Sequence, residues 1–182
     1  MLSSPQPDAS LPLSNDQAAT TQGMAADRTT RRGERGRPLE VLRTLGRLAL
    51  GGALLFAGTG HLTTLRQEFQ AQVPPCIPVD PDVVVVASGV VELGLGAALI
   101  LAPRAWRPAV GWVSAAFFVA IFPGNISQYL TGTDAFGLDS DTSRLVRLFF
   151  QPVLVIWALW STGAWRAWRR RRADRRWRRA GR

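Results

Sequence analysis

Residues Val83 to Ala102, VVVVASGVVELGLGAALILA, decide the fold of this chain. Nearly all twenty are apolar or small, and a single acid, Glu92, stands near their middle. A run of about 20 such residues has the length and composition of a membrane-spanning helix. An acid inside the hydrocarbon is costly unless it faces the protein interior, has a partner or is protonated. We therefore expect Glu92 to face other helices.

Three further stretches have the same character. They cover about residues 45–65, 109–130 and 144–165, so we predict an all-α, polytopic membrane four-helix bundle within residues 39–165. Residues 1–38 are polar and lack apolar periodicity, which predicts a disordered tail. The link over residues 74–81, PPCIPVDP, holds four prolines and excludes a helix. Residues 166–182 form an Arg/Trp-rich tail.

The distribution of arginine predicts the orientation. Seven of the 22 arginines precede or begin the first span, two lie in residues 103–108 and ten lie in the last 18 residues. Because positive charge stays on the cytoplasmic side, both termini are predicted to be cytoplasmic. An Arg/Trp cluster directly after a span is typical of anchoring on anionic lipid headgroups, and nucleic acid ranks lower as a partner. The predicted anchoring residues are Trp165, Trp168, Arg169, Arg170, Arg171 and Arg172.

With this topology, the polar spanning residues gather in the outer half of the membrane. A helix rises about 1.5 Å per residue, which places His61, Asn125 and Arg147 near the outer boundary and Glu92 near the midplane. The inner half is expected to contain only Trp and Ser. We predict a polar cavity open to the outside, which would bind a ligand or relay protons through His61, Ser88, Glu92, Asn125, Arg147 and Gln151.

Small residues predict which helix faces pack closely. Ala49, Ala53 and Ala57 repeat every four residues and form a small-residue face on the first span. Gly89 and Gly96 lie at offsets of three and four from Glu92, so the acid should share a packed face with them.

Each polar residue also has a structural interpretation. Glu92 either forms a buried salt bridge with Arg147 or hydrogen-bonds a ligand as a proton-exchanging group. His61 either bonds a backbone carbonyl or donates a proton. Asn125 and Gln151 either join helices by hydrogen bonds or line the cavity.

The sequence holds one cysteine, Cys76, and one histidine, so we expect no metal site and no disulfide within the chain. It also shows no nucleophile triad and no nucleotide-binding loop. We therefore expect no catalysis by this chain alone.

Four segments together resemble the DoxX-like family of small bacterial membrane proteins. They are GTGHL at 58–62, PPCIP at 74–78, SGVVELGLGAALIL at 88–101 and FPGNI at 122–126. The resemblance covers about residues 42–165 and implies a four-helix protein of the bacterial plasma membrane. It places His61, Glu92, Pro123 and Asn125 at family positions, whereas family members often carry a bulky apolar residue where Cys76 stands.

The name-giving members of that family are associated with a thiosulfate:quinone oxidoreductase, and others with oxidative-stress or thiol-redox complexes. The resemblance thus implies an accessory subunit of a membrane redox complex, with quinone as a candidate cofactor and a redox protein as its partner. A small proton-coupled transporter or channel that uses Glu92 and His61 is the alternative, and a purely structural membrane protein is a third. The small-residue faces also permit a homo-oligomer.

Overall fold

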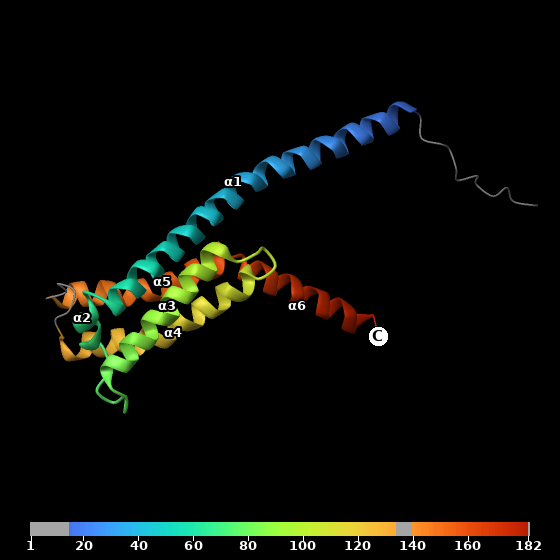
Figure 1. Ribbon diagram of the computed structural model, residues 1–182. Coiled ribbons are helices and arrows are strands. Elements are labelled where there is room, and N and C mark those ends of the chain that lie inside the picture. The colour runs from blue at the N-terminus through green and yellow to red at the C-terminus, as the bar shows by residue number, and fades with distance from the viewer. Residues whose placement is uncertain (1–14, 134–139, 182) are drawn as a thin grey trace, which may run out of the picture. The chain divides into compact units, whose positions relative to one another are not determined.

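The computed structural model describes the backbone of residues 15–133 and 140–181, and the side chains of these residues from 38 onward. The described residues form six helices and no strand (Figure 1), which confirms the all-α class. The helices are α1 (Asn15–Leu62), α2 (Arg66–Gln70), α3 (Pro81–Leu101), α4 (Arg107–Thr131), α5 (Asp141–Ser161) and α6 (Ala164–Ala180). The chain divides into two units, Met1–Val41 and Leu42–Arg182, and the second contains every contact described below.

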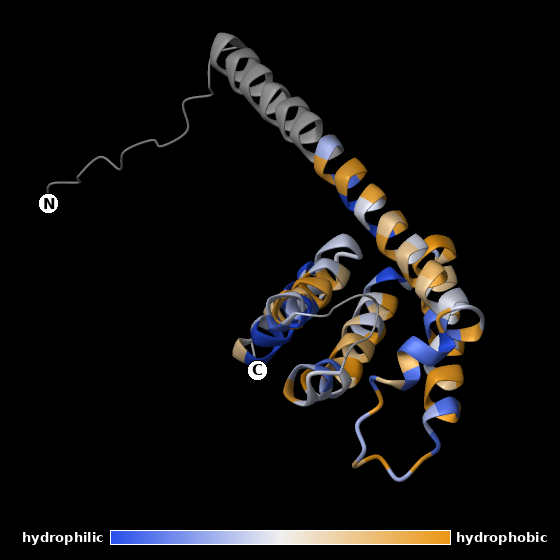
Figure 2. Cartoon of the chain, turned by 90° about the vertical axis from the view of Figure 1, so that its left-hand side faces the viewer, coloured by the Kyte–Doolittle hydropathy of each residue, from blue (hydrophilic) through white to orange (hydrophobic). Residues whose placement is uncertain are grey.

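Four helical segments are long and apolar enough to cross a membrane: Pro38–Leu62, Pro81–Leu101, Arg107–Thr131 and Asp141–Ser161. They correspond to the four predicted spans. In Figure 2, where each residue is coloured by its hydropathy, these segments are largely hydrophobic, whereas the helix next to the label C, α6, is largely hydrophilic. In α1 the helix continues upstream to Asn15, whereas we predicted disorder for residues 1–38. Ala, Gln, Glu and Arg in this stretch are good helix formers. Residues 1–14 lie outside the described residues.

Local chemistry sets the ends of the spans. Asp80 caps α3 by accepting a hydrogen bond from the backbone N–H of Asp82 at 2.7 Å, and Pro81 occupies the first turn. Gly163 has a φ of 72°, which ends α5 and starts α6. The fourth span therefore ends at Ser161, four residues before the predicted end at 165, and Trp165 belongs to α6.

Glycines, and not the predicted alanines, bring α1 and α3 together. A Cβ on Gly96 would lie 2.8 Å from the carbonyl oxygen of Gly51, and one on Gly58 would lie 2.8 Å from that of Gly89. The two glycine pairs run in opposite chain directions, so the helices are antiparallel. Ala49 and Ala53 are exposed, so these two of the three predicted alanines form no contact face within the chain, whereas Ala57 is half-buried and lines the cavity described below. Gly89 and Gly96 pack as predicted.

The bundle core fills the space between the spans with apolar side chains. Buried members include Leu50, Leu54, Leu95, Leu99 and Phe118. Helices α4 and α5 pack along their length, and the predicted interhelical role of Gln151 is confirmed, because its amide donates to the carbonyl of Phe118 at 2.9 Å.

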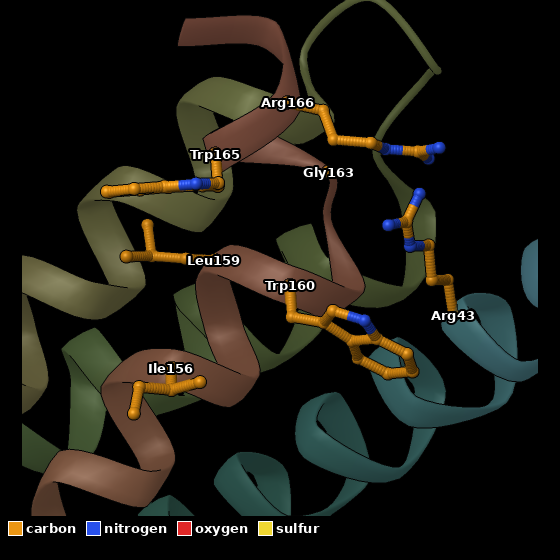
Figure 3. Close-up of a pocket in the computed structure, with 7 residues that line it drawn as sticks. All are labelled: Arg43, Ile156, Leu159, Trp160, Gly163, Trp165 and Arg166. Carbon is orange, nitrogen blue, oxygen red and sulfur yellow. The ribbon is translucent and has the colours of Figure 1, made fainter. Parts of the chain in front are cut away.

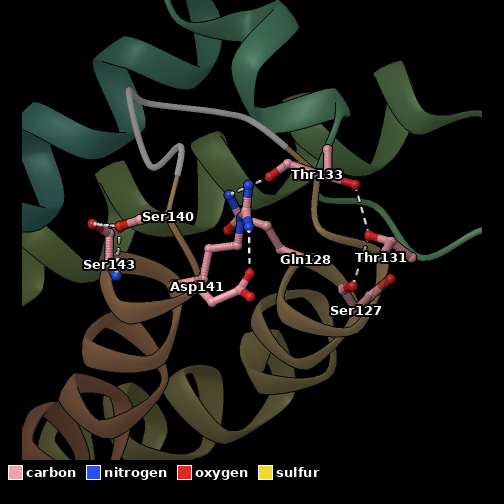
Figure 4. Close-up of polar contacts among 8 residues, drawn as sticks. Ser127, Gln128, Thr131, Thr133, Ser140, Asp141 and Ser143 are labelled. Carbon is pink, nitrogen blue, oxygen red and sulfur yellow. Dashed lines mark hydrogen bonds and ion pairs between the residues drawn. The ribbon is translucent and has the colours of Figure 1, made fainter.

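The ends of α4 and α5 that face away from α6 carry a polar cluster (Figure 4). The Ser140 hydroxyl accepts from the backbone N–H of Ser143 at 3.3 Å and caps α5. Arg144 donates to Asp141 at 2.8 Å, and Gln128 donates to the carbonyl of Thr133 at 3.4 Å. These contacts fix the helix ends beside the cavity described below.

Arg47 corrects the prediction that the spans contain only Trp and Ser as polar residues at the end near α6. It lies within the first span, is 4% exposed, and donates to the carbonyls of Leu99 and Ile100. The last carbonyls of a helix have no partner within it, so a buried guanidinium can satisfy them. The end of the bundle where α3 ends therefore contains a buried arginine that stabilises that helix end.

Candidate functional site: a cavity around His61 and Glu92

A cavity of about 640 Å³ opens between helices α1 to α5. Its wall is largely apolar and includes Leu54, Phe118, Ile121 and Leu154. A volume of this size lies within the roughly 300–1,000 Å³ of ligand pockets. The structure brings all six predicted site residues to this one cavity: His61, Ser88, Glu92, Asn125, Arg147 and Gln151.

Close packing of α1 on α3 places His61 beside Glu92. A Cβ on Gly89 would lie 2.7 Å from the Cβ of His61, so only glycine at this position lets the histidine approach α3 so closely. One helical turn further along α3, Oε2 of Glu92 lies 2.8 Å from Nδ1 of His61. The side chains are 7% and 6% exposed for His61 and Glu92. The two groups form a buried imidazole–carboxyl pair.

The backbone of α1 offers Nδ1 of His61 a second acceptor. Nδ1 of His61 donates to the carbonyl oxygen of Ala57 at 3.0 Å, as one of the two interpretations predicted. The Nδ1–Oε2 distance is short, but the geometry is not that of a hydrogen bond. Among the described residues, Oε2 of Glu92 is consequently a buried oxygen that accepts no hydrogen bond. Such an oxygen is costly to leave unsatisfied, so a proton or a ligand donor would stabilise it.

Helix α2 supplies the other side of His61. The ring of Phe69 stacks on the imidazole with centroids 3.4 Å apart and an interplanar angle of 21°. Asp82 at the start of α3 holds α2 in place, accepting from Nε of Arg66 and from Nε2 of Gln70 at 2.6 Å each. The hydrogen bond to Asp82 raises the pKa of the Arg66 guanidinium above its usual value. This short helix therefore fixes the orientation of the histidine.

Arg147 does not complete the predicted salt bridge with Glu92. Its guanidinium donates to the side-chain oxygen of Gln72 at 2.9 Å and to that of Gln128 at 3.3 Å. The titratable side chain next to Glu92 is His61. The salt-bridge interpretation is thus wrong in its partner, because spacing along a helix gives a face but not the residue across from it. The cavity wall therefore carries two separate polar groups, the His61–Glu92 pair and Arg147 with its two glutamine partners.

The three remaining predicted residues differ in whether their side chains are already hydrogen-bonded within the protein. Asn125 is 8% exposed and lines the cavity, and its side chain makes no hydrogen bond with another described residue. Ser88 donates to the carbonyl of Val85 at 3.0 Å. The amide of Gln151 is engaged with Phe118. Asn125 is therefore the neutral side chain best placed to bond a ligand.

Sequence reasoning missed Phe69 and Gln72 as parts of the site. Both lie just after the first span, on or beside a helix of only five residues, where no periodicity marks the inward face. Within residues 38–133 and 140–181, no three His, Cys, Asp or Glu side chains gather as metal ligands would.

The predicted anchoring residues lie on α6 and not in the cavity. Trp165 and Trp168 have ring centroids 5.1 Å apart, and the guanidinium of Arg172 lies 4.2 Å above the Trp168 ring. The residues Arg169, Arg170, Arg171 and Arg172 are exposed.

Comparison with known proteins gives one match. Residues 50–162 match the family described as Domain of unknown function (DUF8561). The chain belongs to this family. The matched segment contains every residue that lines the cavity, and neither the N-terminal 49 residues nor the tail. No curated protein and no solved structure matches the chain.

Proposed function

We propose that this chain is a multi-pass protein of the bacterial plasma membrane that binds a small, largely apolar molecule with a hydrogen-bonding head, of which a quinone is the leading candidate. It acts as an accessory subunit of a membrane redox or oxidative-stress complex, in keeping with its resemblance to DoxX-like proteins. The observation that carries this proposal is the buried, unsatisfied Oε2 of Glu92 at the wall of an apolar cavity.

The residues of the cavity fit a quinone. Quinone oxygens accept hydrogen bonds and quinol hydroxyls donate them, so a site needs both roles. The carboxyl of Glu92 accepts when ionised and donates when protonated, and a His61 imidazolium could pass its Nδ1 proton across the 2.8 Å to the carboxylate while keeping the proton on Nε2. Apolar walls such as Phe118 and Leu154 suit the ring and tail. Bound quinone would supply the electron and proton chemistry, while a partner protein would supply the redox centre.

The test is to identify molecules retained by the full chain after purification from native membranes in mild detergent. We expect mass spectrometry to find about one quinone per chain. Glu92→Gln should reduce retention at least about tenfold, the loss expected for a hydrogen bond to a charged group. Asp174→Asn in α6 makes the same acid-to-amide change outside the cavity and should leave retention unchanged.

Absence of any retained apolar molecule, or equal retention by Glu92→Gln, would rule out the cavity as a quinone site. A pulldown in mild detergent should also recover a second protein. Recovery of this chain alone would argue against an accessory role.

A proton-coupled transporter is the second candidate, because a buried imidazole–carboxyl pair at 2.8 Å can pass a proton. Leu50, Leu54 and Phe118 line the cavity and belong to the buried apolar core, so transport past them would need a second conformation. In proteoliposomes, a proton-linked flux that Glu92→Gln abolishes would favour this candidate over the quinone subunit.

Cys76 offers a test of the proposed orientation. The thiol is exposed, in the link between α2 and α3. With both termini in the cytoplasm this link faces outward, so a membrane-impermeant maleimide should label Cys76 in intact cells. Cys76→Ser is the control and should remain unlabelled. Labelling that appears only after the cells are permeabilised would reverse the proposed topology.

A further inference from the structure

A second pocket, of about 300 Å³, lies where α1, α5 and α6 meet (Figure 3). It is separate from the cavity around Glu92 and shares no lining residue with it. The indole of Trp157 donates to the carbonyl of Gly46 at 3.0 Å, which holds the end of α5 against the early part of the first span. The pocket therefore lies at one end of the membrane-spanning segments, at the level of the membrane–water boundary.

Two arginines bring positive charge to this pocket. Arg43 comes from α1 and Arg166 from α6, and Figure 3 shows their guanidinium groups on the same side of the pocket. The N-terminus of α6, which begins after Gly163, adds partial positive charge. Two guanidinium groups on one side of a pocket can both donate hydrogen bonds to the same anion. Guanidinium groups match phosphate oxygens in geometry as well as in charge.

The other walls of the pocket are aromatic and aliphatic. The guanidinium carbon of Arg43 lies 5.8 Å from the centroid of the Trp160 ring. Trp165 is 49% exposed and Ile156 is 67% exposed, both on the outer surface of the bundle. Tryptophan favours the headgroup level of a bilayer, and an exposed aliphatic side chain on a span faces acyl chains. Anionic and apolar contacts thus meet at one site.

We propose that this pocket binds one anionic phospholipid, with its phosphate between Arg43 and Arg166 and its acyl chains along Ile156 and Leu159. Charge complementarity selects the occupant, because a zwitterionic lipid would bring its own cation next to the two arginines. This site is distinct from diffuse attraction of the arginine-rich part of α6, since it requires one residue from α1 as well as one from α6. It holds the end of the fourth span at a fixed depth.

The experiment is native mass spectrometry of the full chain released from nanodiscs of mixed phosphatidylglycerol and phosphatidylcholine. We expect one retained phosphatidylglycerol per chain. The double variant Arg43→Gln/Arg166→Gln should bind it about 30-fold more weakly, at roughly fivefold per arginine near the headgroups. The matched control Arg170→Gln/Arg171→Gln removes the same charge from the exposed part of α6 and should change binding less than about twofold.

Equal losses in the two double variants would show diffuse electrostatics and overturn the proposal, as would equal retention of phosphatidylcholine. Displacement of the lipid by inorganic phosphate at equal concentration would also overturn it, because the acyl contacts would then contribute nothing. If the glutamine variant fails to fold, Arg43→Lys/Arg166→Lys keeps both charges but loses the planar guanidinium groups with their paired N–H donors. That variant should still prefer phosphatidylglycerol but bind it more weakly than the natural chain.

Discussion

Gly96→Ala is expected to lower the free energy of unfolding by about 3 kcal/mol, at the upper end of the range for overpacking. A Cβ at this position would lie 2.8 Å from the backbone oxygen of Gly51 and 3.0 Å from the backbone nitrogen of Leu55. Backbone atoms cannot relieve a clash by adopting another rotamer as a side chain can, so α1 and α3 must separate. Unfolding of the full chain by sodium dodecyl sulfate in mixed micelles measures the effect.

Gly94, two residues before Gly96, provides a matched control for Gly96→Ala. A Cβ on Gly94 would have no atom within 4 Å, so Gly94→Ala should leave stability unchanged or raise it slightly through higher helix propensity. Gly51→Ala and Gly52→Ala should repeat this contrast on α1, since Gly51 meets α3 and Gly52 meets nothing. Similar effects at the paired and the open glycines would contradict the proposed α1–α3 contact.

This glycine contact also shows how far sequence reasoning reaches. The four spans could be predicted because length and apolarity are properties of each segment alone. The choice between two small-residue faces on the first span depends on the partner helix. Gly51 and Ala53 are about 200° apart around the helix, and only the structure shows that the glycine side meets α3.

The candidate site divides in the same way. The gathering of the predicted residues at one cavity could be predicted, since the position of each residue along its helix follows from the helix rise. The sequence did not predict which of these side chains contact each other. Glu92 meets His61, and Arg147 meets Gln72 in the segment after α2, because these contacts depend on how far each helix is rotated toward its neighbour. Arg47 was overlooked because a charge near a helix end resembles a boundary marker, yet it is buried against α3.

His61→Leu is expected to be the most destabilising single change, at about 3–5 kcal/mol, because an ionised Glu92 would lose the basic side chain beside its Oε2 and stay buried without a counter-charge. The pair is 2.8 Å apart and almost fully buried. Phe69→Leu serves as a control that removes the ring stacked on the imidazole without changing charge, and should cost only about 1 kcal/mol. The same micelle unfolding titration measures both variants.

A double-mutant cycle then separates charge from packing. If the cost of His61→Leu arises from the carboxylate of Glu92, adding Glu92→Gln to the same chain removes that charge and should recover at least about 2 kcal/mol. Additive effects would mean that His61 stabilises the bundle only through Phe69 and the carbonyl of Ala57. Glu92 would then be held independently of its neighbour, and the two residues could not act as one proton-exchanging unit at the cavity wall. If the double variant His61→Leu/Glu92→Gln regains stability but still fails to retain quinone, the two roles of Glu92 are separate. Its effect on stability would then be relieved, while the group that binds the head of the ligand would be absent.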